Sequence, residues 1–398
     1  MSRKIIFIAL FSFILALFAA GVIFYSASKN NPDLSSEKKS STVSDTKKIN
    51  SPSLNSAPFF VSGWIPYWRK SEGADSLSNN LNLFSELNPF AFGVSSDGDL
   101  IDTAKINSAP WPKLFREART ENVRIVPTIL WTDASAMHEV FASPALLNKH
   151  VDAIAGMLQE NNFSGADIDY EGKNISDRDN FSLFLKDLHQ KLQPLGKSLN
   201  CTVEARTDDL PPAGWTGTRA MSWANDYPAL NEYCDSVRIM AYDEVFQVYR
   251  SQTFENAASS PTASNADNRW VEQVMQYALR YISPQKLILG IPTYGWEFRV
   301  VKNAGGFRYT NIGSISYSAA MAEATSEKVI PKRTDGGELS FAYQTNDGEH
   351  LVTFEDAESI RQKISIAQKL RLGGISLFKI DGSTDPQFFS ALTGLVSN

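Results

Sequence analysis

The 398-residue chain has few of the side chains that build cross-linked or metal-rich scaffolds, with only 2 Cys and 4 His. The two cysteines, Cys201 and Cys234, do not form a CxxC pair, which excludes zinc-ribbon and thioredoxin-like motifs. The histidines form no HExxH pair, which excludes that class of zinc site.

Positive charge is also scarce. The 38 Lys and Arg against 44 Asp and Glu give a formal net charge of −6, and no basic stripe is present. Phosphate binding needs clustered Lys and Arg, so nucleic acid is not expected as a partner. In contrast, 43% of the residues are hydrophobic, which is enough for a large core and excludes disorder over most of the length.

A long apolar run follows two basic residues at the N-terminus and reaches Tyr25. A helix of this length spans the roughly 30 Å hydrocarbon core of a bilayer, so residues 1–25 predict a signal anchor that ties the protein to the membrane. A cleavable signal peptide remains the alternative. The basic residues before the run predict an extracytoplasmic location for everything downstream. Residues 26–58 are rich in Ser, Lys and Asn and predict a disordered linker.

From residue 59 onward, apolar β-rich runs alternate with helical patterns, which predicts an α/β fold and specifically a closed TIM (β/α)8 barrel. The runs are Phe60–Trp68, Pro89–Val94, Val123–Trp131, Phe163–Glu171, Leu199–Arg206, Ser236–Asp243, Lys286–Trp296 and Gly374–Ile380. Residues of about 297–352, between the last two runs, are too many for an ordinary loop and predict a small α+β insertion. Two capping boxes, Ser176 with Asp179 and Thr353 with Asp356, predict helix starts.

Three acids alternate along the fourth run: Asp167, Asp169 and Glu171. Strand side chains alternate between the two faces, so these acids share one face, about 6–7 Å apart, inside the predicted barrel. Neighbouring negative charges and desolvation raise carboxyl pKa values, and at least one acid should hold a proton. Glu171 is the last of the three and would lie at the barrel mouth, where a general acid meets its substrate.

Two other interpretations of this segment are possible. The first is a solvated strand end, against which the apolar neighbours Phe163, Ile168 and Tyr170 favour burial. The second is the start of an EF-hand loop, which fails because Arg178 stands where the bidentate acid is required.

The segment Ser164–Glu171, SGADIDYE, resembles the DGxDxDxE signature of glycoside hydrolase family 18, the chitinase-like TIM barrels, with a serine replacing the first Asp. Gly63–Trp68 is similar to the first strand of that family, Met240–Asp243 (MAYD) to the MxYD motif of the sixth, and Gly290–Trp296 to the seventh. The resemblance covers residues 59–398 and is nearer to bacterial spore and cell-wall members.

The resemblance implies a retaining glycosidase that cleaves β-linked N-acetylglucosaminides, in chitin oligosaccharides or peptidoglycan, with the substrate's acetamido oxygen as the nucleophile. Glu171 would be the acid and then the base, Asp169 would hold the acetamido N–H, Asp167 would share a proton with Asp169, and the Tyr242 hydroxyl would bind the acetamido carbonyl. The expected partner is an N-acetylglucosamine-containing polysaccharide, and a monomer is expected. A hydrolase of this kind implies neither a metal nor an organic cofactor.

Further residues are candidates for sugar binding. Asp243 and Tyr294 belong to the matched motifs, and Phe378 stands where chitinases usually have a tryptophan, which gives a smaller stacking floor. Met240 could form part of the sugar site or fill the core. Tryptophans near strand ends could line subsites or belong to the core: Trp64, Trp68, Trp131 and Trp296.

Two questions stay open. A chitinase-like lectin that binds the glycan without turnover is the alternative function, although such proteins typically lose the catalytic Glu, which this chain retains as Glu171. Cys201 and Cys234 lie on consecutive predicted strands and could form a disulfide or remain two buried thiols.

Overall fold

The computed structural model describes residues 59–209, 223–249, 252–258 and 260–396. The predicted anchor and linker, residues 1–58, lie outside the described residues. Within the described part of the chain, no helix is both long and apolar enough to cross a membrane.

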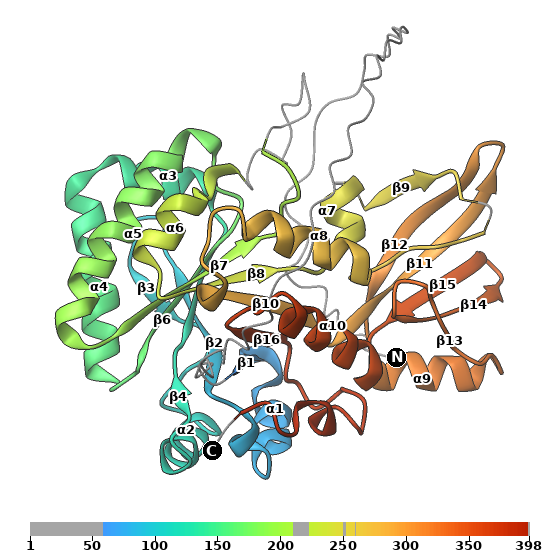
Figure 1. Cartoon of the computed structure of the whole chain (residues 1–398), viewed down its shortest axis with the longest axis horizontal. Coiled ribbons are helices and arrows are strands. Elements are labelled where there is room, and N and C mark those ends of the chain that lie inside the picture. Colours follow the sequence, from blue (N-terminus) through green and yellow to red (C-terminus); the bar gives the residue numbers. More distant parts are fainter. Residues whose placement is uncertain (1–58, 210–222, 250–251, 259, 397–398) are drawn as a thin grey trace, which may run out of the picture. The chain divides into compact units, whose positions relative to one another are not determined.

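Parallel strands close into a barrel (Figure 1). Their order is β1-β16-β10-β8-β7-β6-β5-β2, and the ring closes because β1 also pairs with β2. The strands are β1 (Phe60–Pro66), β2 (Glu86–Val94), β5 (Thr128–Trp131), β6 (Gly165–Tyr170), β7 (Ser198–Glu204), β8 (Ser236–Met240), β10 (Leu287–Pro292) and β16 (Gly374–Phe378). The predicted TIM barrel is therefore confirmed.

Two predicted strands are each interrupted. The run that precedes β6 is split into β4 (Arg124–Ile125) and β5, both of which pair with β2. Pro127 lies in the gap, where it cannot donate a ladder hydrogen bond. The seventh run ends as barrel strand β10 at Pro292 and then begins β11 (Tyr294–Asn303), which belongs to another sheet. A short antiparallel strand, β3 (Leu100–Asp102), also pairs with β2.

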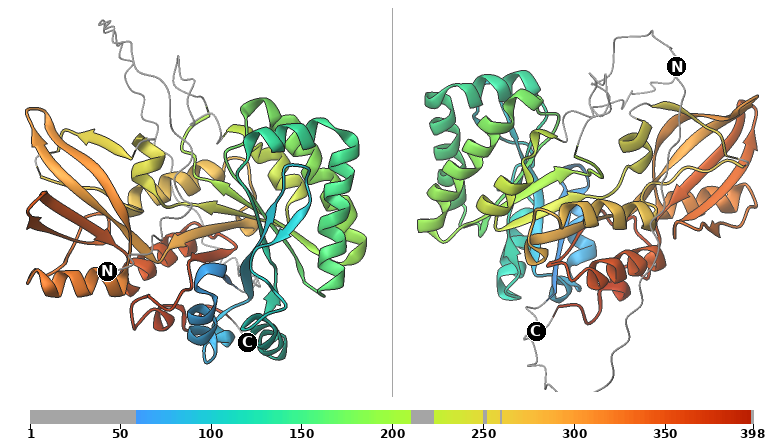
Figure 2. Two further views of the ribbon diagram at one scale, coloured as in Figure 1. Left: turned by 180° about the vertical axis from the view of Figure 1, so that it is seen from behind. Right: turned by 45° about the horizontal axis from the view of Figure 1, so that its top comes forward.

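Helices follow most barrel strands and pack around the barrel, as the views in Figure 2 show. Their bounds are α1 (Lys70–Leu77), α2 (Trp111–Thr120), α3 (Ala134–Ala142), α4 (Pro144–Glu160), α5 (Arg178–Leu192), α6 (Tyr227–Tyr233), α8 (Asn268–Ala278) and α10 (Ala357–Lys369). Helix α7 (Glu244–Tyr249) instead places Val245 in an apolar cluster with Phe254 and Phe298 of the second sheet described below. In α5, Phe181, Phe184 and Leu188 are buried at helical spacing, so this helix turns one apolar face to the strands.

The segment between β10 and α10 forms most of a second, antiparallel sheet with the order β13-β14-β15-β11-β12-β9 (Figures 1 and 2). Its strands are β9 (Thr253–Asn256), β11, β12 (Gly306–Ser316), β13 (Lys332–Arg333), β14 (Leu339–Thr345) and β15 (Gly348–Phe354). Helix α9 (Tyr317–Ser326) packs its small buried residues Ala320 and Ala324 in one apolar cluster with Phe341 and Phe354.

A disulfide joins Cys201 on β7 to Cys234, which precedes β8, with 6.0 Å between the two Cα atoms. Both residues are buried. The strands β7 and β8 are neighbours in register, with Cys201 opposite Val237, which brings the two thiols within reach. Of the two possibilities left open by the sequence, the structure shows the bridge.

Candidate active site

Asp167 and Asp169 on β6, and Glu171 directly after it, face the barrel interior. The residues between these acids face the surrounding helices. Asp167 pairs in register with Thr128 on β5 and Asn200 on β7. On the opposite face, the Tyr170 hydroxyl lies 2.6 Å from Nε2 of the buried His150. Burial lowers the pKa of His150 to about 4, so this ring is neutral and serves the core.

Asp167 is held by donors from four different strands. Its Oδ2 accepts bonds from Trp64 Nε1 at 3.0 Å and Thr128 Oγ1 at 2.7 Å. Its Oδ1 accepts bonds from Thr202 Oγ1 at 2.7 Å and Arg238 at 2.9 Å. Four donors, one of them a cation, fit an ionised and immobile carboxylate, because an ionised carboxylate only accepts.

Arg238 also joins Asp167 to a second buried acid, Glu86 on β2. All three side chains are fully buried, and Asn88 and Asn200 donate to Glu86 at 2.9 and 3.1 Å. The arginine therefore balances the charges of acids on two strands. Asp167, Arg238 and Glu86 form the lower layer of the site, deeper in the barrel than Asp169 and Glu171, and the arginine holds this layer in place. Neither Arg238 nor Glu86 was predicted from the sequence, although Arg238 lies two positions before Met240 on β8 and therefore shares its face of the strand.

The carboxyl groups of Asp169 and Glu171 are not held by hydrogen bonds in the way that Asp167 is. Among the described residues, no hydrogen bond joins Asp167 to Asp169, and Asp169 Oδ1 is buried without a partner. Burial and the charges of Glu171 and Asp167 raise the pKa of Asp169 well above its ordinary value. Burial first, and then the charges of Glu204 and Asp243, raise the pKa of Glu171 to about 7. Since Asp167 already accepts four bonds, sharing a proton with Asp169 would require one carboxyl group to turn.

The residues after β8 form the next part of the site. Asp243 Oδ1 accepts hydrogen bonds from the Tyr294 hydroxyl at 2.6 Å and Trp296 Nε1 at 2.9 Å. Asn265 is buried and binds both the backbone N–H of Asp243, at 3.0 Å, and the carbonyl of Tyr294, at 2.9 Å. Asp243 itself has a positive φ of 58°, so these contacts fix an unusual backbone conformation at the site.

Phe378, at the end of β16, lies among four aromatic rings. The Tyr242 ring is parallel to it, with centroids 5.6 Å apart and planes at 9°. Trp64 and Tyr294 meet it edge to face at 5.9 and 6.0 Å, and Phe90 lies at 6.3 Å. The Phe378 ring thus lies beside Tyr242 within an aromatic cluster, and its role as a stacking floor for a sugar stays a prediction.

Two tryptophans differ from the expectation of a sugar-lining role. Trp131 is buried on the outer face of β5, where it contacts Phe141, His150 and Tyr170, so it is a core residue and its assignment to substrate binding is wrong. The reason is strand alternation, because Thr128 faces inward and a residue three positions later faces outward. Trp64 is inside the barrel but buried, and its indole N–H supports Asp167.

The remaining candidates lie closer to the surface. Met240 ends β8 and is half-buried against the main core, and its contribution to a sugar site stays a prediction. Trp68 is 43% exposed just beyond β1, with its ring edge to face against Phe90 at 5.9 Å. A row of rings therefore leads from the surface at Trp68 through Phe90 to Phe378.

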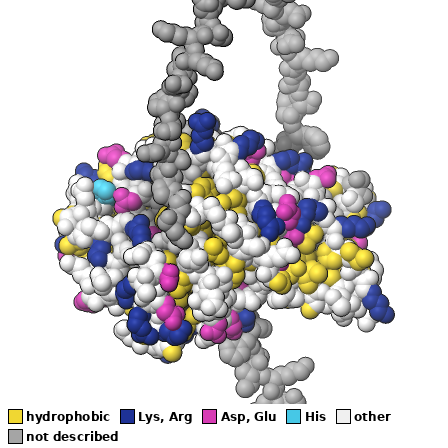
Figure 3. All heavy atoms as spheres, turned by 60° about the horizontal axis from the view of Figure 1, so that its bottom comes forward, with side chains coloured by type: hydrophobic (Ala, Val, Ile, Leu, Met, Phe, Trp, Pro, Cys, Tyr) yellow, Lys and Arg dark blue, Asp and Glu magenta, His cyan; other side chains and the backbone are white. Residues whose placement is uncertain are grey.

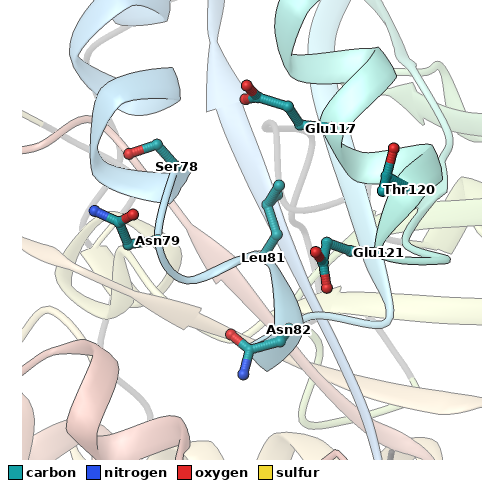
Figure 4. Close-up of a pocket in the computed structure, with 7 residues that line it drawn as sticks. All are labelled: Ser78, Asn79, Leu81, Asn82, Glu117, Thr120 and Glu121. Atoms are coloured by element: carbon teal, nitrogen blue, oxygen red, sulfur yellow. The ribbon is translucent and has the colours of Figure 1, made fainter.

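A cavity of about 580 Å³ lies away from these residues (Figure 4). It is lined by Ser78, Asn79, Leu81, Asn82, Glu117, Thr120 and Glu121. These residues lie at the C-terminal ends of α1 and α2, hence at the barrel end opposite the C-terminal ends of the strands, where catalytic residues of TIM barrels are found. We do not assign the activity to it.

Comparison with known proteins agrees with this geometry. The family model of "Glycosyl hydrolases family 18" matches residues 63–383, and the chain belongs to this family. A "Cortical fragment-lytic enzyme" of Bacillus anthracis is 25% identical over 300 residues, 73% of this chain and 63% of that protein. An "Uncharacterized glycosylase YvbX" of Bacillus subtilis is 22% identical over 65% of this chain and 69% of its own length.

Solved structures share the fold. The spore cortex-lytic enzyme SleL of Bacillus cereus has a TM-score of 0.68 at 22% identity, covering 85% of this chain and 75% of SleL. A chitinase of Chromobacterium violaceum also has a TM-score of 0.68 at 22% identity, covering 85% of this chain and 99% of that one. The chain is a glycosidase, and its relatives within the family include several named for the lysis of spore cortex.

Proposed function

We propose that this glycosidase is an extracytoplasmic, retaining enzyme that cleaves β-linked N-acetylglucosaminides with assistance from the substrate's own acetamido group. One observation carries the proposal. Beside Glu171, neither Asp169 Oδ1 nor the Tyr242 hydroxyl has a hydrogen-bond partner among the described residues. An acetamido group offers an N–H to the first and a carbonyl oxygen to the second.

The proposed chemistry needs one acid and one orienting residue. Protonated Glu171 gives its proton to the leaving glycosidic oxygen while the acetamido oxygen attacks the anomeric carbon, so that the old C–O bond breaks and a cyclic oxazolinium forms. Water then attacks the anomeric carbon and gives a proton back to Glu171. A pKa of about 7 suits a group that must act first as acid and then as base.

Retention of the β-anomer follows from the two inversions at the anomeric carbon. Asp169 would stabilise the positive charge of the oxazolinium, and Tyr242 would fix the attacking oxygen. Asp167 and Arg238 would keep the lower layer rigid below them.

The substrate class is a polymer that contains N-acetylglucosamine. The relatives named for spore cortex lysis favour peptidoglycan, and the chitinases among the relatives favour chitin oligosaccharides. The row of rings from Trp68 to Phe378 suits a glycan strand, because sugar faces stack on aromatic rings.

The proposed location rests on two observations. The apolar run within residues 1–25 would anchor the chain in a membrane, or direct its secretion if it is cleaved. The disulfide between Cys201 and Cys234 is typical of oxidising compartments. We propose that the enzyme acts there as a monomer.

Mass spectrometry of the products from purified peptidoglycan and from chitin oligomers tests the substrate class. NMR of the first product tests retention, with the β-anomer expected. Binding of chitin oligomers without any product would favour the lectin alternative, which the retained Glu171 opposes.

A further inference from the structure

Glu204 is a second carboxylate in the upper layer of the barrel interior, next to Glu171. It ends β7, two residues after Thr202, which lies opposite Asp169, and it lies opposite Met240 on the other side. Only 8% of the residue is exposed. No motif of the sequence pointed to it.

Two N–H donors hold Glu204. The backbone N–H of Gly172, the residue after Glu171, donates to Oε1 at 3.2 Å, and the side-chain amide of Asn225 donates to Oε2 at 2.6 Å. Asn225 is fully buried. Each carboxylate oxygen thus accepts one bond, which suits an ionised group, and the Gly172 contact fixes its place relative to Glu171.

More negative than positive side chains surround Glu171. Asp169 on β6 and the hydroxyls of Tyr242 and Tyr294 also face Glu171, but their raised pKa values leave all three groups neutral at neutral pH. Negative charges come from Glu204 on β7 and Asp243 after β8. Their combined charge disfavours the ionised form of Glu171.

Among the described residues, Lys173 is the one cation whose charge lowers the pKa of Glu171. It is fully buried, bonds the carbonyl of Tyr170 and lies 4.6 Å from the centre of the Phe181 ring. No ion pair joins it to Glu204 or Glu171 among the described residues, so the charge of Glu204 is not cancelled directly.

We propose that Glu204 is a positioning residue for the general acid: clamped by Gly172 and Asn225, it holds a fixed negative charge beside Glu171, and this charge keeps Glu171 protonated at neutral pH until substrate arrives. The inference rests on the proposed function, in which Glu171 must enter the reaction protonated. Among the neighbouring charges that raise the pKa of Glu171, Glu204 has the largest effect after burial.

The variant Glu204→Gln tests this with little change of shape. The amide of Asn225 can turn so that Oδ1, which is buried without a partner among the described residues, accepts from the new amide. The full-length variant should show an alkaline limb of kcat/KM on N-acetylated oligomers that is about one pH unit lower than in the wild type. Activity at pH 8 should fall about tenfold, with little change at pH 5.

Two controls separate charge from structure. Glu204→Asp keeps the charge and should keep most of the alkaline limb. Glu121→Gln removes one exposed charge at the other end of the barrel, beside the cavity of Figure 4, and should leave the profile unchanged. A merely structural role for Glu204 would lower kcat/KM at every pH without moving the limb, and that result would overturn the proposal.

A second readout does not depend on turnover. With ¹³C-labelled glutamate carboxyls, the Glu171 signal is identified by its loss in Glu171→Gln, and its titration is compared between wild type and Glu204→Gln. We expect the midpoint to fall in the variant, and an unchanged midpoint contradicts the proposal. If the wild type cleaves no glycan, the proposed function fails, but this titration still decides the role of Glu204.

Discussion

Glu171 owes its protonation mainly to burial and neighbouring charge, since no side-chain hydrogen bond to it is formed by the described residues. Burial raises the pKa of this group to about 7, so at neutral pH about half of the molecules have the acid form. The same property costs stability, because the folded state then holds a carboxylate in a place where ionisation is unfavourable.

The first prediction is that Glu171→Gln folds and binds glycan but loses turnover by at least about 10²–10⁴-fold, because the amide cannot donate the proton. The variant should also be more stable than the wild type at pH 8, with the difference vanishing below about pH 4.5. Steady-state kinetics and urea unfolding at the two pH values measure both effects. Wild-type turnover in the variant would remove Glu171 from the mechanism.

The second prediction concerns the acetamido group. Asp169→Asn and Tyr242→Phe should each reduce hydrolysis of N-acetylated oligomers strongly, because they remove the acceptor and the donor that would orient the nucleophile. Fully de-N-acetylated oligomers should resist the wild type as well. Product analysis that finds cleavage beside a sugar with a free amine would contradict substrate assistance.

The third prediction concerns Phe378, which already contacts Trp64, Phe90, Tyr242 and Tyr294. Phe378→Trp should raise kcat/KM on chitin oligomers modestly, since one stacked ring contributes about 0.5–1.5 kcal/mol beyond burial. Overpacking among these rings can cost about 1–3 kcal/mol, so thermal melting is the control. A stable variant with unchanged or lower efficiency would place specificity elsewhere.

At the scale of residues, alternation along a strand identified the inward acids of β6 because each lies two positions from the next. The same rule, applied to β5, would have placed Trp131 in the core. Arg238 and Glu204 were not predictable in the same way, because an isolated charge in an apolar run shows its function only when the strands that face it are known.

At the scale of elements, the runs of the sequence predicted the barrel strands, while their ends depended on local chemistry. The capping box assigned to Ser176 is wrong, because a 3₁₀ turn over Ile175–Asp177 precedes α5, whose N-cap has no side-chain bond. Before α10, the box is formed by Asp356 and Ser359 instead of Thr353, which belongs to β15.

The fourth prediction concerns the bridge between β7 and β8. Replacing Cys201 and Cys234 together by Ala opens a loop with a sequence separation of 33 residues. The entropy of this loop predicts a loss of about 3–4 kcal/mol in the free energy of unfolding. Urea unfolding measures it, with wild type reduced under denaturing conditions as the control. Quantitative labelling of both thiols in denatured, unreduced wild type would show that the bridge does not form.

At the scale of the whole molecule, the exposed and the buried charges act differently. On the face drawn in Figure 3, acidic and basic side chains lie side by side. Pairs such as Lys149 with Asp99, at 2.8 Å, are solvated and contribute little. Buried acids lie inside the barrel and where the second sheet meets α7 and α10. Burial raises the pKa of Glu244 to about 7 and that of Glu338 to about 8.

These buried acids determine how stability depends on pH. A carboxyl whose folded pKa is raised contributes stability that is present below its unfolded pKa of about 4.5 and is lost as the pH rises through the folded value. Glu171, Glu244 and Glu338 therefore all act in this direction. His150 acts in the opposite direction, because burial lowers its pKa to about 4, but its effect is complete above pH 6.5, its ordinary value. Between pH 6.5 and 8.5 only the loss remains.

The fifth prediction is that Tm falls by several degrees between pH 6.5 and 8.5, and that Glu338→Gln makes this fall smaller. The amide oxygen of the variant can still accept the backbone N–H groups of Asn265 and Ala266, which Glu338 Oε1 binds at 2.8 and 3.0 Å. Glu121→Gln, which removes an exposed charge, should leave the slope unchanged. A Tm that is constant or rises over this range would mean that the buried acids ionise without cost, and the same burial could then not hold the proton on Glu171.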